Sequence, residues 1–141
     1  MGGQGTILLV EDSSDVRELI CDDVLEYVGY TTHSVKDAPA ALAFLEQSGP
    51  VDLLLTDIVL PRGMNGVELA RRVQETAPLT EVLFMTGYSV DELENLGISV
   101  SDHYLFHKPF SVEDLMRVVA ETLDGRNGSL IGDGGGGKPV S

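Results

Sequence analysis

Short runs of apolar residues alternate along the chain with longer segments in which apolar residues recur every three or four positions. Five runs have the length of strands, at residues 6–10, 30–34, 51–56, 81–86 and 104–106. The first, third and fourth are almost continuously apolar, which is typical of central strands in a parallel sheet covered by helices on both faces. The second run is more polar, so we expect it at an edge of the sheet.

Each run is followed by a segment of helical period. The last four of these segments span residues 38–47, 67–76, a weaker stretch at 90–96, and 112–123. The first has Ser13 or Ser14 as its N-cap, Gly29 as its end, and apolar positions at Val16, Leu19, Ile20, Val24 and Val28. Because strand–helix–strand crossovers are right-handed, five strands alternating with five helices predict a doubly wound α/β fold.

Composition is consistent with one globular domain and excludes some classes of binding partner. The 141 residues are 43% apolar and carry a formal net charge of −14. This charge repels nucleic-acid phosphates and anionic membranes, so we expect neither as a partner. No apolar stretch approaches the roughly 18 residues of a membrane span. The single cysteine, Cys21, and the absence of a signal-peptide pattern predict a cytoplasmic protein.

The two ends differ in composition from the rest of the chain. Residues 1–5 and 125–141 are rich in glycine and contain too little apolar surface to offset the entropy of ordering them. We therefore predict a disordered N-terminus at 1–5, one domain at 6–124 and a flexible Gly-rich tail at 125–141.

Chemically reactive side chains follow the predicted strands: Glu11 and Asp12 after the first, Asp57 after the third, Thr86 at the end of the fourth and Lys108 after the fifth. Ligands of doubly wound sheets gather at the carboxyl ends of the strands, so these side chains are expected to converge. Crowded carboxylates raise each other's pKa unless a cation pairs with them, and Mg²⁺ prefers such oxygen ligands. A carboxylate nucleophile with a metal, a hydroxyl group and a lysine describes an aspartyl-phosphate site.

Each residue also has an ordinary structural interpretation. Glu11 and Asp12 could be acids at the N-terminus of a helix, Asp57 could be a loop acid or a cap, and Lys108 with Pro109 could form a turn. Four strand ends in the right order nevertheless carry the residue types that the chemistry needs. The combination favours the phosphate site.

Four segments together resemble the response-regulator receiver family of two-component signalling. They are Val10-Glu11-Asp12, residues 56–61, residues 84–87 and Lys108-Pro109-Phe110, and the resemblance covers about residues 6–124. It implies a flavodoxin-like sheet of five parallel strands in the order 2-1-3-4-5. Residues 60–69 resemble receivers associated with hybrid sensor kinases, and residues 84–88 resemble the FATGUY group of single-domain receivers.

The resemblance implies specific roles for the strand-end residues. Asp57 is the expected phosphoacceptor, and Mg²⁺ is the expected cofactor, held by Asp12, Asp57 and the Val59 carbonyl, with Glu11 supporting it through water. Thr86 and Lys108 are expected to contact the phosphoryl group, and the peptide bond before Pro109 is expected to be cis.

The resemblance also implies partners and an output. The phosphoryl donor would be a histidine kinase or a phosphotransfer protein, and the protein would be a monomer or a weak dimer. Because no DNA-binding or enzymatic segment of appreciable size follows Leu123, the output would be a protein contact or the withdrawal of phosphate from a kinase. The sequence does not identify the downstream partner.

One position departs from the family pattern. Many receivers have an aromatic residue three positions before the lysine, where it switches together with the threonine, Thr86 here, but this chain has Leu105. Either phosphorylation rearranges another segment, such as residues 88–101, or a bulged strand lets Tyr104 substitute. We favour the first alternative, because alternation along a strand points Tyr104 to the face opposite Leu105.

Two other functions compete with the receiver interpretation. A phosphohydrolase of the haloacid-dehalogenase type needs an acid two residues after the nucleophile, but that position is Val59. An interaction module that is never phosphorylated would not need Asp12, Asp57, Thr86 and Lys108. We therefore expect no enzymatic turnover beyond the protein's own phosphorylation and slow autodephosphorylation.

Overall fold

A five-stranded parallel sheet forms the centre of the molecule. The computed structural model describes residues 5–25, 29–100 and 103–128. Its strands are β1 (Thr6–Val10), β2 (Thr31–Val35), β3 (Leu53–Asp57), β4 (Glu81–Thr86) and β5 (Leu105–His107). They are arranged in the order β2-β1-β3-β4-β5, which confirms the predicted flavodoxin-like topology and the edge position of the second strand.

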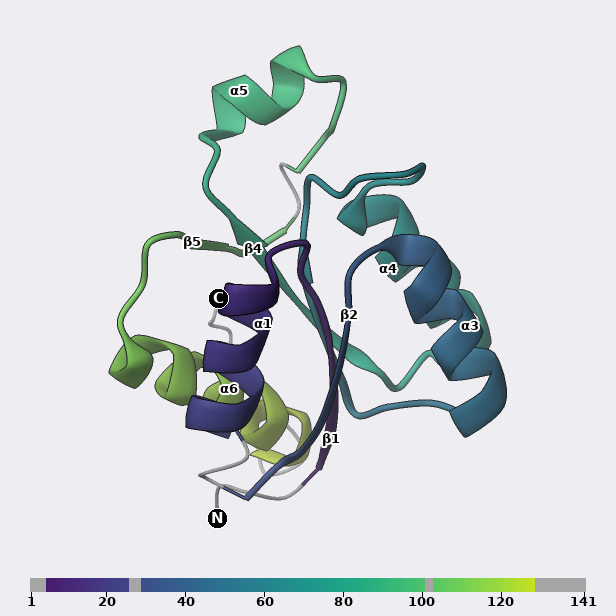
Figure 1. Ribbon diagram of the computed structural model, residues 1–141, viewed down its shortest axis with the longest axis vertical. Helices are drawn as coiled ribbons and strands as arrows, with labels where there is room; N and C mark the ends of the chain where they lie inside the picture. The colour runs from purple at the N-terminus through teal and green to yellow at the C-terminus, as the bar shows by residue number, and fades with distance from the viewer. Residues whose placement is uncertain (1–4, 26–28, 101–102, 129–141) are drawn as a thin grey trace.

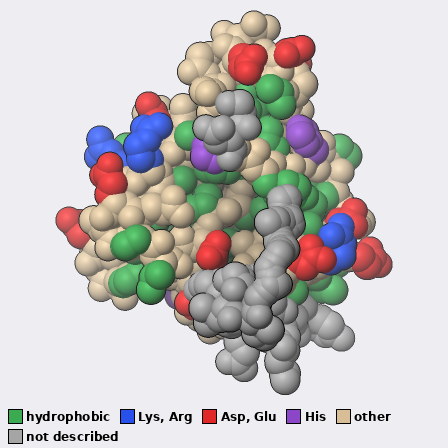
Figure 2. All heavy atoms as spheres, turned by 180° about the vertical axis from the view of Figure 1, so that it is seen from behind, with side chains coloured by type: hydrophobic (Ala, Val, Ile, Leu, Met, Phe, Trp, Pro, Cys, Tyr) green, Lys and Arg blue, Asp and Glu red, His purple; other side chains and the backbone are tan. Residues whose placement is uncertain are grey.

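Helices cover both faces of the sheet (Figure 1). On one side lie α1 (Ser14–Glu18) and α6 (Val112–Gly128), and on the other lie α3 (Ala38–Ser48) and α4 (Gly66–Thr76). The short helix α5 (Val90–Asn95) stands beyond the carboxyl ends of the strands (Figure 1), and its Leu93 is buried in the cluster that contains residues of α3 and α4. Figure 2 shows the back of the molecule, where acidic side chains are scattered and basic ones are confined to two places.

The strands alternate between two hydrophobic clusters, one under each helical layer. Along β3, Leu53 and Leu55 pack with residues of α6, whereas Leu54 packs with residues of α3 and α4. All three leucines are fully buried. Each such burial contributes about 1.5–3 kcal/mol to folding, which explains why this run contains almost no polar residue before its end.

The first helical segment differs from the prediction of one regular α-helix. After α1, residues Leu19–Leu25 form a π-helix, η1, whose turns are wider than those of an α-helix. Ile20 and Leu25, five residues apart, are both buried, while Leu19 is 47% exposed. The prediction that Leu19 is a core position is therefore wrong, because the three-and-four spacing assumed α-helical turns. The predicted apolar position Val28 lies outside the described residues.

The helix ends follow their capping residues. Ser13 is the N-cap of α1, and its side chain accepts a hydrogen bond from Val16 N–H at 3.3 Å. The Ser111 hydroxyl oxygen accepts a bond from Asp114 N–H at 3.0 Å, as their spacing predicts. At its other end, α6 continues to Gly128, beyond the predicted domain boundary at 124. Glycine weakens a helix by about 1 kcal/mol without blocking it sterically, so a helix can run through the glycine-containing segment. Residues 1–4 and 129–141 lie outside the described part of the chain.

The loop between β3 and α4 is closed by a close approach of two backbone segments. Gly66 N–H donates a hydrogen bond to Ile58 O at 2.7 Å. A Cβ atom at Gly66 would lie only 2.1 Å from the carbonyl oxygen of Asp57. Glycine is therefore required here because there is no room for a side chain.

The tip of the same loop is fastened to the start of α3. Arg62 has a left-handed backbone with φ 58°, and its Nε atom lies 2.6 Å from Asp37 Oδ2. Asp37 is also the N-cap of α3, accepting a hydrogen bond from Ala40 N–H. The Arg62 guanidinium and this N–H hold the pKa of Asp37 below its usual value. One buried carboxylate thus joins the loop to the helix.

Across the described residues, no helix has both the length and the hydropathy needed to cross a bilayer.

We predict that Gly66→Ala lowers the free energy of unfolding by about 1–3 kcal/mol, because the new methyl group forces the Asp57 backbone to move. Urea unfolding followed by circular dichroism measures the effect. Gly87→Ala is the matched control, since a Cβ there meets nothing within 4 Å. Equal stability of the two variants would contradict the assigned close approach.

Candidate functional site

Three side chains that are distant in sequence meet at the carboxyl end of the sheet. Glu11 follows β1, Asp57 ends β3 and Lys108 follows β5. Lys108 Nζ lies 2.8 Å from Glu11 Oε1 and 2.8 Å from Asp57 Oδ1. The carboxylates are almost fully buried, with side-chain exposures of 4% and 11%. One ammonium group therefore bridges two buried carboxylates.

The backbone places Lys108 directly beside β4. Its N–H donates a hydrogen bond to Thr86 O at 2.8 Å, next to the pairing of Thr86 with His107 that ends the β4–β5 ladder. The peptide bond between Lys108 and Pro109 is cis. The lysine thus starts from the end of the sheet and reaches across it to Asp57 at the end of β3.

Glu11 is held at both its backbone and its carboxylate. Its N–H donates to Val35 O at 3.0 Å, and its carbonyl oxygen accepts from Arg17 Nη1 at 2.8 Å. Its Oε2 accepts from Ser13 N–H at 3.0 Å, while Oε1 accepts from Lys108. The next residue, Asp12, has an exposed side chain. The two acids at the end of β1 therefore have different surroundings.

The two buried carboxylates do not ionise alike. Burial raises the pKa of Asp57 to about 7, with a further increase from Glu11, although Lys108 opposes it. Burial also acts to raise the pKa of Glu11, but hydrogen bonds with Asp57, Lys108 and Ser13 N–H outweigh it and leave the pKa below its usual value. Glu11 is the less exposed carboxylate, yet it collects more donors. The proton that the pair retains is therefore assigned to Asp57.

Lys108 stays charged between these acids. Burial alone would lower its pKa, but hydrogen bonds to Asp57 and then Glu11 raise the pKa above its ordinary value. Its single positive charge faces two carboxylates, so the site has an excess of negative charge once both are ionised.

The donor set fits a small divalent cation. Such a cation would remove the conflict between Glu11 and Asp57, which otherwise leaves one of them protonated near neutral pH. No three His, Cys, Asp or Glu side chains converge into a ligand cluster among the residues described. Mg²⁺ needs no such cluster, because it commonly binds one or two carboxylates and keeps several waters. Asp12, exposed at the same strand end, and the half-buried Val59 are the remaining predicted ligands.

The predicted switch residues lie at the end of β4 and at the start of β5. Thr86 is buried, and its hydroxyl oxygen accepts a hydrogen bond from Tyr88 N–H at 2.9 Å. Leu105 is half-buried and pairs with Phe84. The register from Leu105 to His107 is regular, so these residues contain no bulge. Tyr104 precedes the strand and is 52% exposed.

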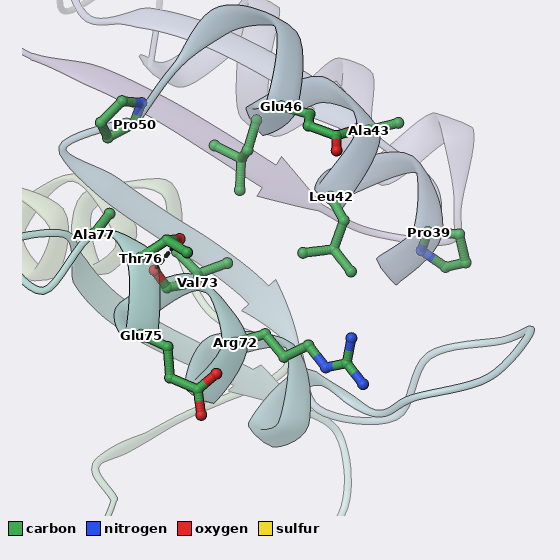
Figure 3. A pocket seen from close by; sticks show the side chains of 11 residues that line it. Pro39, Leu42, Ala43, Glu46, Pro50, Arg72, Val73, Glu75, Thr76 and Ala77 are labelled. Atoms are coloured by element: carbon green, nitrogen blue, oxygen red, sulfur yellow. Dashed lines mark hydrogen bonds between the residues drawn. The ribbon is translucent and has the colours of Figure 1, made fainter.

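A groove of about 720 Å³ lies elsewhere, between α3 and α4. Leu42 and Val73 point into it from the two helices, and Arg72 extends along it (Figure 3). None of Glu11, Asp57 and Lys108 lines it. The reactive groups are therefore at the strand ends and not in this groove.

Sequence reasoning missed two residues that act on this site through the backbone. Arg17 reaches the carbonyl oxygens of Glu11 and Asp12, and Gly66 lies against that of Asp57. The only available signal for Arg17 was a basic residue one helical turn after the N-cap, close to two acids. For Gly66 it was a glycine at the start of a helix.

Comparisons with known proteins agree on one family. The family model described as "Response regulator receiver domain" matches residues 7–120. Similar proteins include the response regulator receiver protein CpdR of Brucella abortus (strain 2308), 36% identical, with 83% of this chain and 95% of that protein covered. The sensor kinase CckA of the same organism is 35% identical, with 88% of this chain but only 13% of the kinase covered.

A similar solved structure is the signal receiver domain of an HD domain-containing protein from Pseudomonas fluorescens Pf-5. It is 26% identical to this chain with a TM-score of 0.75, and the match covers 93% of this chain and 95% of that one.

We predict that Asp57→Asn stabilises the metal-free protein more at pH 8 than at pH 4. An unfolded aspartate ionises near pH 4, whereas folded Asp57 ionises at about pH 7. Between these values the folded state binds more protons than the unfolded state, so the contribution of Asp57 to stability falls as pH rises. An asparagine side chain at this position does not ionise, so its contribution to stability does not fall as pH rises.

Thermal unfolding in EDTA at a series of pH values measures this difference. The midpoint of Asp57→Asn should exceed that of the wild type by several degrees at pH 8, and the gap should shrink toward pH 4. Asp91→Asn, at an exposed position on α5, should follow the wild type throughout. A gap that is constant with pH would contradict the assigned charge state.

Proposed function

The chain belongs to the response regulator receiver domain family of two-component systems, and on this basis we propose that Asp57 accepts the phosphoryl group. The observation that carries the proposal is the position of its carboxylate at the end of β3, 2.8 Å from Lys108 Nζ. Receiver domains take a phosphoryl group onto an aspartate. In this chain, Asp57 is the aspartate that lies beside both Glu11 and Lys108.

The transfer is a substitution at phosphorus. One carboxylate oxygen of Asp57 forms a bond to phosphorus, while the bond from phosphorus to the donor's nitrogen or oxygen breaks and its electron pair leaves with the donor. The attacking carboxylate must be ionised, and the ammonium of Lys108 favours that state. The same ammonium can then neutralise charge on the phosphoryl oxygens, so most of the catalysis comes from positioning and charge.

We propose Mg²⁺ as the cofactor, held by Asp12, Asp57 and the Val59 carbonyl, with Glu11 supporting it through water. When bound, the ion supplies positive charge that keeps the carboxylates ionised and draws in the phosphoryl oxygens. The excess of carboxylates over ammonium at the site supports this proposal.

Receiver domains interact with histidine kinases or phosphotransfer proteins, and we propose such a protein as the phosphoryl donor of this chain. The likeness to a receiver protein and to part of a sensor kinase supports this.

Beyond its own phosphorylation and slow autodephosphorylation, the domain would catalyse no reaction. We further propose a cytoplasmic monomer or weak dimer that signals through a protein contact or acts as a phosphate sink.

We propose that phosphorylation is transmitted through the segment from Tyr88 to Val100. The Thr86 hydroxyl oxygen accepts a hydrogen bond from Tyr88 N–H, and the next residue, Ser89, is the N-cap of α5. A threonine that turns toward the phosphoryl group gives up this contact with the start of α5. Leu105, in place of an aromatic side chain, has no ring to move with it.

The first test is phosphorylation by acetyl phosphate with Mg²⁺, measured by mass spectrometry of the intact protein. The wild type should gain one phosphoryl mass, and Asp57→Asn should gain none because it lacks the acceptor oxygen. Asp91→Asn is the matched control and should behave as the wild type, while EDTA should suppress the reaction.

Two results would overturn the proposal. Absence of the added mass in the wild type would indicate a module that acts by binding alone. Repeated release of phosphate from a small phosphomonoester would indicate a phosphohydrolase.

A second test separates the two routes of transmission. Amide NMR spectra before and after phosphorylation should change over residues 88–100, and they should change equally in Tyr104→Ala, because the route through Thr86 and Tyr88 does not need that ring. Loss of the changes in Tyr104→Ala would assign the switch to Tyr104. Tyr30→Phe, at a buried position in the opposite layer, is a control for general loosening of the fold.

A further inference from the structure

Arg17 reaches back from α1 to the end of β1. Its Nη1 atom donates hydrogen bonds to two consecutive carbonyl oxygens, that of Glu11 at 2.8 Å and that of Asp12 at 3.2 Å. Among the described residues, the bonds of this guanidinium go to backbone oxygens and to no carboxylate. These carbonyls belong to the two acids at the end of β1.

The contact fixes the backbone from which both acidic side chains start. On one side, Glu11 N–H is bound to Val35 O at the end of β2, and on the other, Arg17 binds the carbonyl oxygen of the same residue. Glu11 is thus held at both its N–H and its carbonyl oxygen. From this backbone the Glu11 carboxylate lies beside Asp57, and Asp12 is exposed at the strand end.

The charge of Arg17 alone would work against a cation site. A guanidinium close to Glu11 and Asp12 repels a divalent cation bound there. The hydrogen bonds of Arg17 act in the opposite sense, because groups that orient metal ligands strengthen metal binding. Loss of such groups commonly weakens metal affinity by about 10–100-fold. The two effects predict changes of opposite sign when the charge is removed.

We propose that Arg17 is a positioning residue that sets Glu11 and Asp12 for a divalent cation through their carbonyl groups. This inference rests on the proposed function, in which Mg²⁺ serves the phosphorylation of Asp57. It assigns to the helix after β1 a part in building the site, although Arg17 itself touches neither the cation nor the phosphoryl group.

The test compares Mg²⁺ dissociation constants of the full chain by isothermal titration calorimetry, without a phosphoryl donor. Arg17→Gln should bind Mg²⁺ about tenfold more weakly than the wild type. Arg117→Gln is the matched control, because Arg117 is exposed on α6 and pairs with Asp114 and Glu121. It should bind Mg²⁺ as the wild type does, or slightly more tightly.

A second variant serves if Arg17→Gln does not fold. Arg17→Lys keeps the charge, but its ammonium nitrogen ends one bond short of the position of Nη1. It should bind Mg²⁺ more weakly than the wild type, because it keeps the repulsion and loses hydrogen bonds to the carbonyl oxygens. An unchanged dissociation constant in Arg17→Lys would count against the proposal, because Mg²⁺ binding would then not depend on the hydrogen bonds to the Glu11 and Asp12 carbonyl oxygens.

Amide hydrogen exchange gives a readout that needs no metal. Ser13 N–H donates to Glu11 Oε2, so its exchange should become faster in Arg17→Gln if the peptide after Glu11 loses its position. Exchange of amides in β3 should stay unchanged. Uniform acceleration across the sheet would indicate only a loss of global stability and would overturn the positioning role.

The outcomes separate this inference from the proposed function. A wild-type protein that binds Mg²⁺ but gains no phosphoryl mass would defeat the proposed function, while the comparison of variants would still decide the role of Arg17. Mg²⁺ binding by Arg17→Gln that equals or exceeds that of the wild type would overturn the inference, even if Asp57 is phosphorylated. So would a wild type that binds no Mg²⁺.

Discussion

The ammonium group of Lys108 lies between two carboxylates that would otherwise repel each other at the end of a buried sheet. Glu11 and Asp57 reach this place because β1 and β3 are neighbours and end together. Both strands are buried on two faces, so the first polar side chains after them emerge where little water can screen them. The two carboxylates therefore carry more negative charge than the Lys108 ammonium neutralises, and a further cation would reduce their repulsion. The surrounding contacts hold these three side chains in place.

The fold could be predicted from the sequence because its strongest signals are local. Continuous apolar runs identified the central strands, and the rule that ligands gather at strand ends predicted that Glu11, Asp57 and Lys108 converge. The first helix could not be predicted in detail. Its apolar spacing suits an α-helix, yet Ile20 and Leu25 reach the core through a π-helix that exposes Leu19. Ile20 and Leu25 both belong to the core cluster on this face of the sheet. The spacing of apolar residues along the chain does not predict this packing.

The supporting contacts of the site could not be predicted from the sequence, for a different reason. Arg17 and Gly66 act on carbonyl oxygens, and every residue has one, so a sequence does not reveal which carbonyl a side chain will reach. The same holds for the pairing of Asp37 with Arg62, whose residues are 25 positions apart. Residues that bear reactive groups can be recognised by type, whereas residues that hold backbone in place become visible only when the chain is folded.

The ion pair of Arg62 with Asp37 has a mechanical consequence. The left-handed backbone of Arg62 costs about 1–3 kcal/mol relative to a relaxed conformation, and the ion pair, together with the closed contact at Gly66, stiffens the loop after Asp57. On the opposite flank, α5 begins directly after the contact of Thr86 with Tyr88, and its Leu93 is buried in the cluster that contains residues of α3 and α4. The loop after Asp57 is thus held by an ion pair and a backbone contact, whereas the start of α5 is joined to the end of β4 by the hydrogen bond from Tyr88 N–H to the Thr86 hydroxyl oxygen.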